Sequence, residues 1–374
     1  MKKLLFFFFT IGLASNLFAQ KQMNGYSESE TKQQNTIEDL FLDMVDFPGY
    51  KDHLITITAH PHTAGSKANE EVRDYLIKTM EEADLETTLY PYDVYIPKDP
   101  GTSVVEIVTP KRKPLNQKED IISGNPYSSH PELPKGWNAY SGSGDVTAEV
   151  VYANYGTKED YEKLAELGID IQGKIVLARY GKNFRGFKAK YAEQYGAAGV
   201  LIYTDPRDYG YSKGLVYPEG NNYNESAIQR GSVLTESFTG DPLTPFEPAL
   251  PLDGKTKIKR LNVNETSLHT IPVTPIGYGA AGEIMAWMKG KPVPGAWQGG
   301  LPYTYRFEGG PDLKVRLGVS QPKEFVRINN IVGTVKGSLY PDEWIILGCH
   351  YDAWAFGATD PGSGTAMLLT LSEA

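Results

Sequence analysis

The residues best suited to chemistry lie together near the C-terminal end of the sequence. The segment GCHYDAWAFGATDPGSG, residues 348–364, combines one histidine and two aspartates with several glycines. His350 offers a ring nitrogen that can bind zinc, and Asp352 could hold the other ring nitrogen by a hydrogen bond. Asp360 adds a carboxylate that could bridge two metal ions. The alternative is a turn in which Asp and Gly only satisfy the backbone geometry, and the residue types alone leave both interpretations open.

The elements that flank this segment favour a place at the edge of a sheet. Asn330–Val335 and Trp344–Leu347 are near-continuous apolar runs of strand length, which predicts two strands inside a sheet that is covered on both faces. A helix is predicted to begin at Thr365. Segment 348–364 then follows the C-terminal end of a buried strand, which is where ligands bind in open α/β sheets.

The pattern of predicted elements changes after a predicted strand at 87–96. Before this strand, apolar spacing predicts helices over 36–53 and 66–84, the second capped by Ser66. After it, up to about residue 321, short strands alternate with turn-rich loops, which is typical of an inserted β-rich domain. Its predicted strands are Val104–Val108, Thr147–Tyr152, Lys174–Arg179 and Gly199–Tyr203, and its predicted helices lie near Gly186–Tyr195 and Ala280–Met288.

Composition narrows the function classes. The chain has 374 residues, 40% of them hydrophobic, which is enough for a large core and about two domains. The net charge of −9 and the lack of a basic stripe argue against a nucleic-acid partner. Cys349 is the single cysteine, which excludes an internal disulfide. Its apolar surroundings predict a buried, inert thiol.

The N-terminal residues have the composition of a signal peptide, predicted over residues 1–19. Lys2 and Lys3 precede a short apolar run, and small residues follow it, with cleavage expected after Ala19. The alternative is a membrane anchor, but the apolar run is too short to span a bilayer comfortably. We therefore expect a secreted or periplasmic protein without a stable membrane anchor. Residues 20–35 are polar and predict a flexible N-terminus.

Six segments of this sequence are similar, in the same order, to segments of one peptidase family. They are HPHTAGS (60–66), GKIVLARYGKNFRG (173–186), GAAGVLIYTDPRDYG (196–210), GDPLTP (240–245), IPVTPIGYGAA (271–281) and the stretch from NNIVG to DPGSG (329–364). From about Asn35 to its last residue, the chain resembles the zinc exopeptidase family that contains glutamate carboxypeptidase II and the transferrin receptor.

The resemblance implies a fold of the α/β class. That fold is a zinc-peptidase (phosphorylase/hydrolase-like) mixed sheet with helices on both faces, here truncated and interrupted by a β-rich protease-associated domain. The implied divisions are a first peptidase part at 36–99, the insertion at 100–322 and a truncated second peptidase part at 323–374.

The resemblance also implies roles for individual residues. His350 matches a histidine that binds one zinc ion, Asp360 matches an aspartate that bridges two zinc ions ahead of a cis peptide bond, and Asp352 matches the aspartate behind that histidine. In the insertion, Arg179 matches an arginine that grips the side-chain carboxylate of a C-terminal glutamate. Ser232 stands where the family has an asparagine partner, a departure that puts a glutamate preference in doubt. The alternative for Arg179 is a structural charge.

The function implied is that of the N-terminal portion of a secreted di-zinc metallo-exopeptidase, of carboxypeptidase or aminopeptidase type, that hydrolyses peptides. The resemblance also admits a calcium ion and a homodimer of the full-length protein. The family's general-base glutamate and remaining metal ligands match positions downstream of Ala374, so the chain alone is expected to be inactive. The alternatives are a receptor-like or binding protein of the same fold without metals, and a free-standing binding module built around the insertion.

Overall fold

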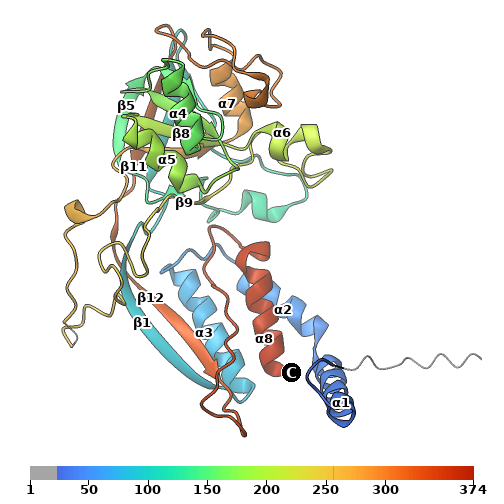
Figure 1. Ribbon diagram of the computed structural model, residues 1–374. Coiled ribbons are helices and arrows are strands. Elements are labelled where there is room, and N and C mark those ends of the chain that lie inside the picture. The colour runs from blue at the N-terminus through green and yellow to red at the C-terminus, as the bar shows by residue number, and fades with distance from the viewer. Residues whose placement is uncertain (1–22, 256) are drawn as a thin grey trace, which may run out of the picture.

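The protein folds into two lobes, which Figure 1 shows one above the other. A computed structural model describes residues 23–255 and 257–374, so the predicted signal peptide lies outside the described residues. The lower lobe is built from both ends of the described chain and the upper lobe from its middle (Figure 1). The lower lobe contains α1 (Glu28–Met44), α2 (Phe47–Ile57), α3 (Lys67–Glu82), β1 (Glu86–Ile96), β12 (Glu324–Thr334) and α8 (Ser363–Glu373).

The lower lobe is a pair of antiparallel strands with helices on one side. β1 pairs with β12 from Glu86 opposite Thr334 to Ile96 opposite Glu324. α3 packs on this pair, and α8 packs on α2 and α3 (Figure 1). Ser66 caps α3 by accepting the backbone N–H of Asn69, as predicted. The described residues thus show two strands and one covered face of the expected peptidase sheet.

Two four-stranded sheets form the upper lobe. The parallel sheet has the order β10 (Val273–Ile276), β8 (Gly199–Tyr203), β7 (Ile175–Arg179) and β6 (Val150–Tyr152). The antiparallel sheet has the order β3 (Lys113–Pro114), β2 (Thr102–Thr109), β11 (Lys314–Ser320) and β5 (Gly144–Ala148). Every residue of β7 and β8 is buried, which explains why both strands are apolar up to Arg179 and Tyr203 at their ends, and α5 (Arg185–Gln194) crosses from one strand to the next. The lobe also contains the helices α4 (Lys158–Glu166), α6 (Pro206–Tyr209) and α7 (Tyr278–Met285), and the short paired strands β4 (Asn138–Ala139) and β9 (Gly231–Ser232).

The α/β class and the main elements of the insertion agree with the prediction. β2, β7, β8, α5 and α7 all overlap the segments predicted for them, and the strand predicted at 147–152 is divided between β5 and β6. The insertion is richer in helix than expected, because its parallel strands need helical crossovers such as α5. No helix in the described part of the chain is long and apolar enough to cross a membrane.

The helix predicted over 36–53 is wrong in its bounds. The structure has two helices there, α1 and α2, which are separated at Val45 and Asp46. Pro48 explains the break, because proline lacks a backbone N–H and fits only the first turn of a helix. The flexible N-terminus predicted over 20–35 is also wrong from Glu28 onwards. Ser27 and Glu30 form a capping box that starts α1, a signal that the polar composition hid.

The strand predicted over Trp344–Leu347 is wrong as well. This segment has no regular structure, and its apolar side chains are exposed, Ile345 to 94%. A strand needs a neighbour to satisfy its backbone, and among the described strands β1 pairs with β12 while none lies against residues 344–347. Cys349 follows this segment and is exposed, which contradicts the buried thiol expected from its apolar surroundings.

The two lobes have separate apolar cores. One cluster, from Val105 to Val319, lies entirely within the upper lobe. The other consists of Ile57, Val72, Leu76, Ala366 and Leu369, all in the lower lobe. A segment with its own core has what it needs to fold alone.

We therefore expect residues 100–322, expressed alone, to unfold in one cooperative thermal transition. The termini of this segment lie close together, because β2 and β11 near its two ends pair side by side. Calorimetry and limited proteolysis of the isolated segment would test this expectation. A broad, non-cooperative transition with rapid cleavage throughout would count against an independent domain.

Candidate metal centre

The loop between β12 and α8 brings His350, Asp352 and Asp360 together. Nε2 of His350 lies 3.1 Å from Oδ1 of Asp360. On the other side of the ring, Nδ1 of His350 lies 3.0 Å from the backbone oxygen of Asp352 and 3.3 Å from its Oδ1. The two ring nitrogens therefore face two different carboxylates, as the residue spacing suggested. The peptide bond between Asp360 and Pro361 is cis, which agrees with the expectation from the resemblance.

A short tight turn gives the loop its shape. Gly357 adopts a left-handed backbone with φ of 68°, and a Cβ atom there would lie 2.5 Å from Cβ of Ala353. The segment Ala358–Gly362 follows, is kinked at Asp360, whose backbone is extended (φ −126°, ψ 107°), and runs into α8. Thr365 of α8 donates its hydroxyl to the backbone oxygen of His350 at 2.8 Å. Glycine is thus required where the loop folds back, and the helix anchors the histidine backbone.

The loop before α3 supports this site from behind. The backbone N–H of His62 donates to the oxygen of Ala355 at 3.3 Å, and the N–H of Ala353 donates to the oxygen of His62 at 3.1 Å. His62 is fully buried, and its Nε2 has no hydrogen-bond partner among the described residues. Burial lowers the pKa of this imidazole, and its hydrogen bond with the backbone oxygen of His60 opposes that shift in part. The segment HPHTAGS therefore contributes to the site through packing and backbone pairing.

The geometry fits two ligands of one zinc ion. In a tetrahedral site with bonds of about 2.0–2.1 Å, neighbouring ligand atoms lie roughly 3.3 Å apart, close to the separation of the His350 and Asp360 atoms. A proton on Nδ1 would be held by Asp352, which leaves the Nε2 lone pair for the metal. The side chains of His350 and Asp360 are 56% and 84% exposed, so solvent reaches the site from one side. A zinc site normally has three or four protein ligands, and this loop supplies two.

The two residues predicted to contact substrate lie in the upper lobe. Arg179 ends β7 and is 1% exposed. Its Nη2 donates to Oδ1 of Asn154 at 2.6 Å, its Nη1 lies 3.5 Å from Oδ2 of Asp208, and its Cζ lies 3.9 Å from the ring centre of Tyr155. In β9, the hydroxyl of Ser232 accepts the N–H of Leu234 at 2.9 Å. Arg179 is therefore already held by its own lobe, and its side chain would have to be uncovered to touch a substrate.

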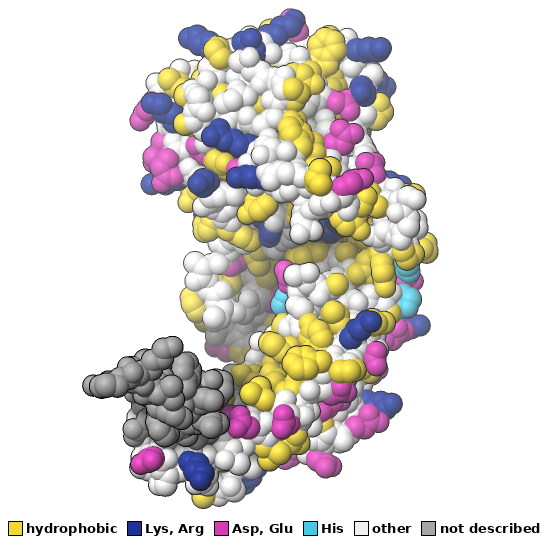
Figure 2. All heavy atoms as spheres, turned by 90° about the vertical axis from the view of Figure 1, so that its right-hand side faces the viewer, with side chains coloured by type: hydrophobic (Ala, Val, Ile, Leu, Met, Phe, Trp, Pro, Cys, Tyr) yellow, Lys and Arg dark blue, Asp and Glu magenta, His cyan; other side chains and the backbone are white. Residues whose placement is uncertain are grey.

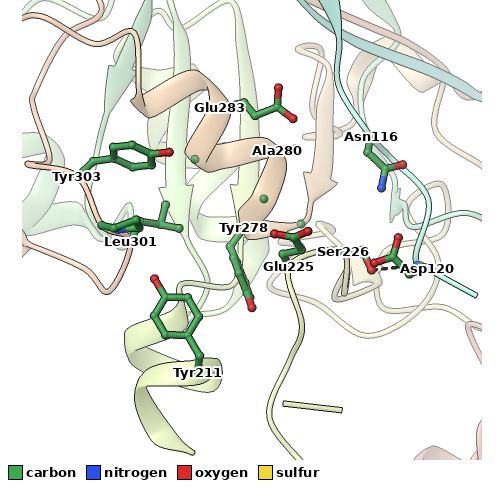
Figure 3. A pocket seen from close by; sticks show the side chains of 14 residues that line it. Asn116, Asp120, Tyr211, Glu225, Ser226, Tyr278, Ala280, Glu283, Leu301 and Tyr303 are labelled. Atoms are coloured by element: carbon green, nitrogen blue, oxygen red, sulfur yellow. Dashed lines mark hydrogen bonds between the residues drawn. The ribbon is translucent and has the colours of Figure 1, made fainter. Parts of the chain in front are cut away.

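A cavity of about 600 Å³ lies elsewhere in the upper lobe (Figure 3). Figure 3 shows Tyr211, Tyr278 and Tyr303 around it, with Glu225 and Glu283 among its acidic residues. Glu283 is paired with Lys113, and burial raises the pKa of Tyr278 to about 12. The residues that line this cavity include no histidine and none of the predicted site residues. It is an aromatic, acidic recess that is separate from the predicted metal site.

Two protein-family models match this chain, one in each lobe. A PA domain model matches residues 146–240, inside the predicted insertion, and a model of peptidase family M28 matches residues 330–374. The chain is 33% identical to the glutamate carboxypeptidase 2 homolog of Caenorhabditis elegans over 353 residues, which are 89% of this chain and 44% of the relative. It is 31% identical to aminopeptidase NAALADL1 of Rattus norvegicus over 358 residues, which are 90% of this chain and 47% of the relative.

The chain thus spans about half the length of the curated relatives that it matches. Among solved structures, the peptidase M28 precursor from Shewanella amazonensis SB2B has a similar fold, with a TM-score of 0.51 and 18% identity, covering 90% of this chain and 62% of that chain. The recognisable similarity therefore extends over both lobes, and it includes the loop that carries His350 and Asp360.

Proposed function

We propose that this chain, which is similar to peptidase family M28 over residues 330–374, is part of a zinc metallo-exopeptidase that hydrolyses peptides. The observation that carries the proposal is the placement of His350 between Asp352 and Asp360. That arrangement orients one imidazole nitrogen and one carboxylate toward the same point. A receptor-like protein that had lost its metals would have no need of this pairing.

Each residue of the loop has a defined task in this proposal. His350 and Asp360 would hold the metal, and Asp352 would keep the His350 ring in one orientation and tautomer. When bound, zinc supplies a Lewis acid that polarises a peptide carbonyl and activates water at neutral pH. The buried His62 loop would keep the site from shifting, since it pairs with the backbone at Ala353 and Ala355. The general base and the remaining ligands are proposed to lie beyond residue 374.

The finer parts of the proposal rest on the resemblance and on the N-terminal composition. They are a pair of zinc ions bridged by Asp360, a calcium ion elsewhere, a homodimer of the full-length protein, and export after cleavage at Ala19. The mature chain is then expected to begin at Gln20, which N-terminal sequencing of exported protein would establish. Exported protein that keeps Met1 would refute the cleavage.

The first test is the nucleotide sequence beyond the codon for Ala374. The proposal requires an open reading frame that continues and encodes paired glutamates, because two ligands do not make a catalytic zinc site. In the 374-residue chain alone, we expect no hydrolysis of N-acylated or free dipeptides with added zinc. A frame that stops at Ala374, or zinc-dependent turnover by the 374-residue chain, would contradict this account of the site.

In the protein encoded by the continued reading frame, Asp360→Ala is expected to lower kcat/KM on dipeptides by a factor on the order of 100 or more. The reason is that a metal contributes several kcal/mol of transition-state stabilisation, and each factor of ten corresponds to about 1.4 kcal/mol. Asp342→Ala is the matched control, since Asp342 is also an exposed aspartate of the C-terminal segment but lies outside the site. Equal activity in the two variants would remove Asp360 from the proposed centre.

A further inference from the structure

We propose that His60, His130 and Glu132 form a separate binding site for zinc or a similar divalent transition metal, where the two lobes meet. Each residue offers one ligand atom, and the three atoms all lie within 4.8 Å of one another. His60 comes from the loop between α2 and α3 in the lower lobe, whereas His130 and Glu132 come from the insertion. Figure 2 shows histidine side chains on the surface at the level where the lobes meet.

The geometry is close to that of a metal site with three protein ligands. Nδ1 of His60 lies 2.9 Å from Oε2 of Glu132, slightly less than the roughly 3.3 Å that separates neighbouring ligands of tetrahedral zinc. The rings of His60 and His130 meet edge to face, with centres 5.9 Å apart. Small side-chain rotations would aim all three groups at one ion. Two histidines and one glutamate leave a fourth position for water, a set known from zinc enzymes.

The third residue separates this site from an ordinary ion pair. An exposed pair such as His60 with Glu132, whose side chains are 53% and 59% exposed, contributes little to stability on its own. His130 is not needed for that pair, yet it lies beside it. Its Nδ1 accepts the backbone N–H of Glu132 at 3.2 Å, so a metal bound through this nitrogen would take the place of that hydrogen bond.

The surroundings give the site a structural consequence. Phe356, from the loop that carries His350, packs edge to face on His130 with ring centres 5.3 Å apart. Tyr127 of the insertion also packs edge to face on Phe356, with ring centres 5.0 Å apart. Other contacts also join the lobes, among them the edge-to-face packing of Trp137 on Trp354. A bound metal would fasten the lobes to each other and hold the Phe356 side of the loop.

The test is zinc titration of the 374-residue chain by calorimetry. The chain carries His350→Ala, which removes the histidine of the first candidate metal site. We expect one zinc ion to bind, and His60→Gln or His130→Gln to weaken its binding at least ten-fold. Glu132→Gln should also weaken binding, whereas Glu343→Gln, at an exposed glutamate away from the cluster, should not. Magnesium and calcium should give no heat, because these ions prefer all-oxygen sites. Circular dichroism would establish that each variant is folded.

A second measurement reports on the lobes themselves. Zinc should slow proteolysis of the two connections between the lobes, near residues 97–101 and 321–323, and His130→Gln should remove this protection. The proposal is overturned if the His350→Ala chain binds no zinc, or if zinc affinity is the same after His60 and His130 are replaced. Protection that persists in His130→Gln would likewise exclude a metal bridge at this position. None of these outcomes depends on peptidase activity, so the proposed function is tested separately.

Discussion

Arg179→Met is expected to lower the free energy of unfolding of the upper lobe by about 3 kcal/mol. The guanidinium is 1% exposed, donates a hydrogen bond to Asn154 and packs on the ring of Tyr155, while the carboxylate of Asp208 lies 3.5 Å away as an ion pair without a hydrogen bond. Removing one partner of a buried ion pair typically costs about 3–5 kcal/mol, because the remaining charge stays buried without compensation. We expect the lower end of that range, since the Asp208 side chain is 22% exposed and water can reach it.

Arg316→Met is the matched control in the same lobe. Arg316 also pairs with an aspartate, Asp145, at 2.6 Å, but these side chains are 37% and 53% exposed. An exposed pair of this kind contributes less than about 1 kcal/mol. Urea denaturation of both variants would measure the difference. Equal stability would mean that the buried guanidinium is not a structural charge, and the alternative role for Arg179 as a substrate contact would gain support.

Much of the upper lobe could be predicted because its signals are local. The apolar runs of β7 and β8 and the helix between them are short, continuous and separated by glycine turns, so the periodicity alone places them. The capping box at Ser27 was also present in the sequence, but the polar residues around it concealed a helix. The strand predicted over Trp344–Leu347 is absent for a different reason. An apolar run becomes a strand only if another strand lies beside it, and residue type does not supply that partner.

The two candidate metal sites differ in how far apart their residues lie in the sequence. His350, Asp352 and Asp360 are close in sequence, so spacing was enough to group them, and the contacts in the loop agree. His60 and Glu132 are 72 residues apart and meet only because the insertion folds back onto the lower lobe. The sequence singled out the HPHTAGS segment, but it offered no signal that would join His60 to His130. That grouping required the fold.

Asp205→Ala is expected to destabilise the upper lobe by about 3–5 kcal/mol. Asp205 is fully buried two residues after β8, where it caps α6, and four groups donate hydrogen bonds to its carboxylate. Oδ1 accepts the backbone N–H of Arg207 at 2.9 Å and that of Gly300 at 2.7 Å. Oδ2 accepts the hydroxyls of Tyr203 and Tyr305. Alanine would leave the buried hydroxyls of Tyr203 and Tyr305 and two part-buried N–H groups without this acceptor. Each buried donor costs roughly 1–3 kcal/mol if unsatisfied, although water entering the space would recover part of the sum.

Asp205→Asn separates the hydrogen bonds from the charge. The Asn oxygen can still accept the N–H groups of Arg207 and Gly300, and its amide can donate to the two tyrosine hydroxyls after these rotate. We therefore expect Asn to cost clearly less than Ala, with Asp312→Ala, at an exposed aspartate whose side chain is 71% exposed, as a nearly neutral control. Near-ultraviolet circular dichroism during urea denaturation would follow the buried tyrosines directly. Because Asp205 ties β8 to the segment containing Leu301 and Tyr303, its loss should also loosen one wall of the 600 Å³ cavity. If Ala and Asn were equally mild, the carboxylate would not be the centre that holds these segments together.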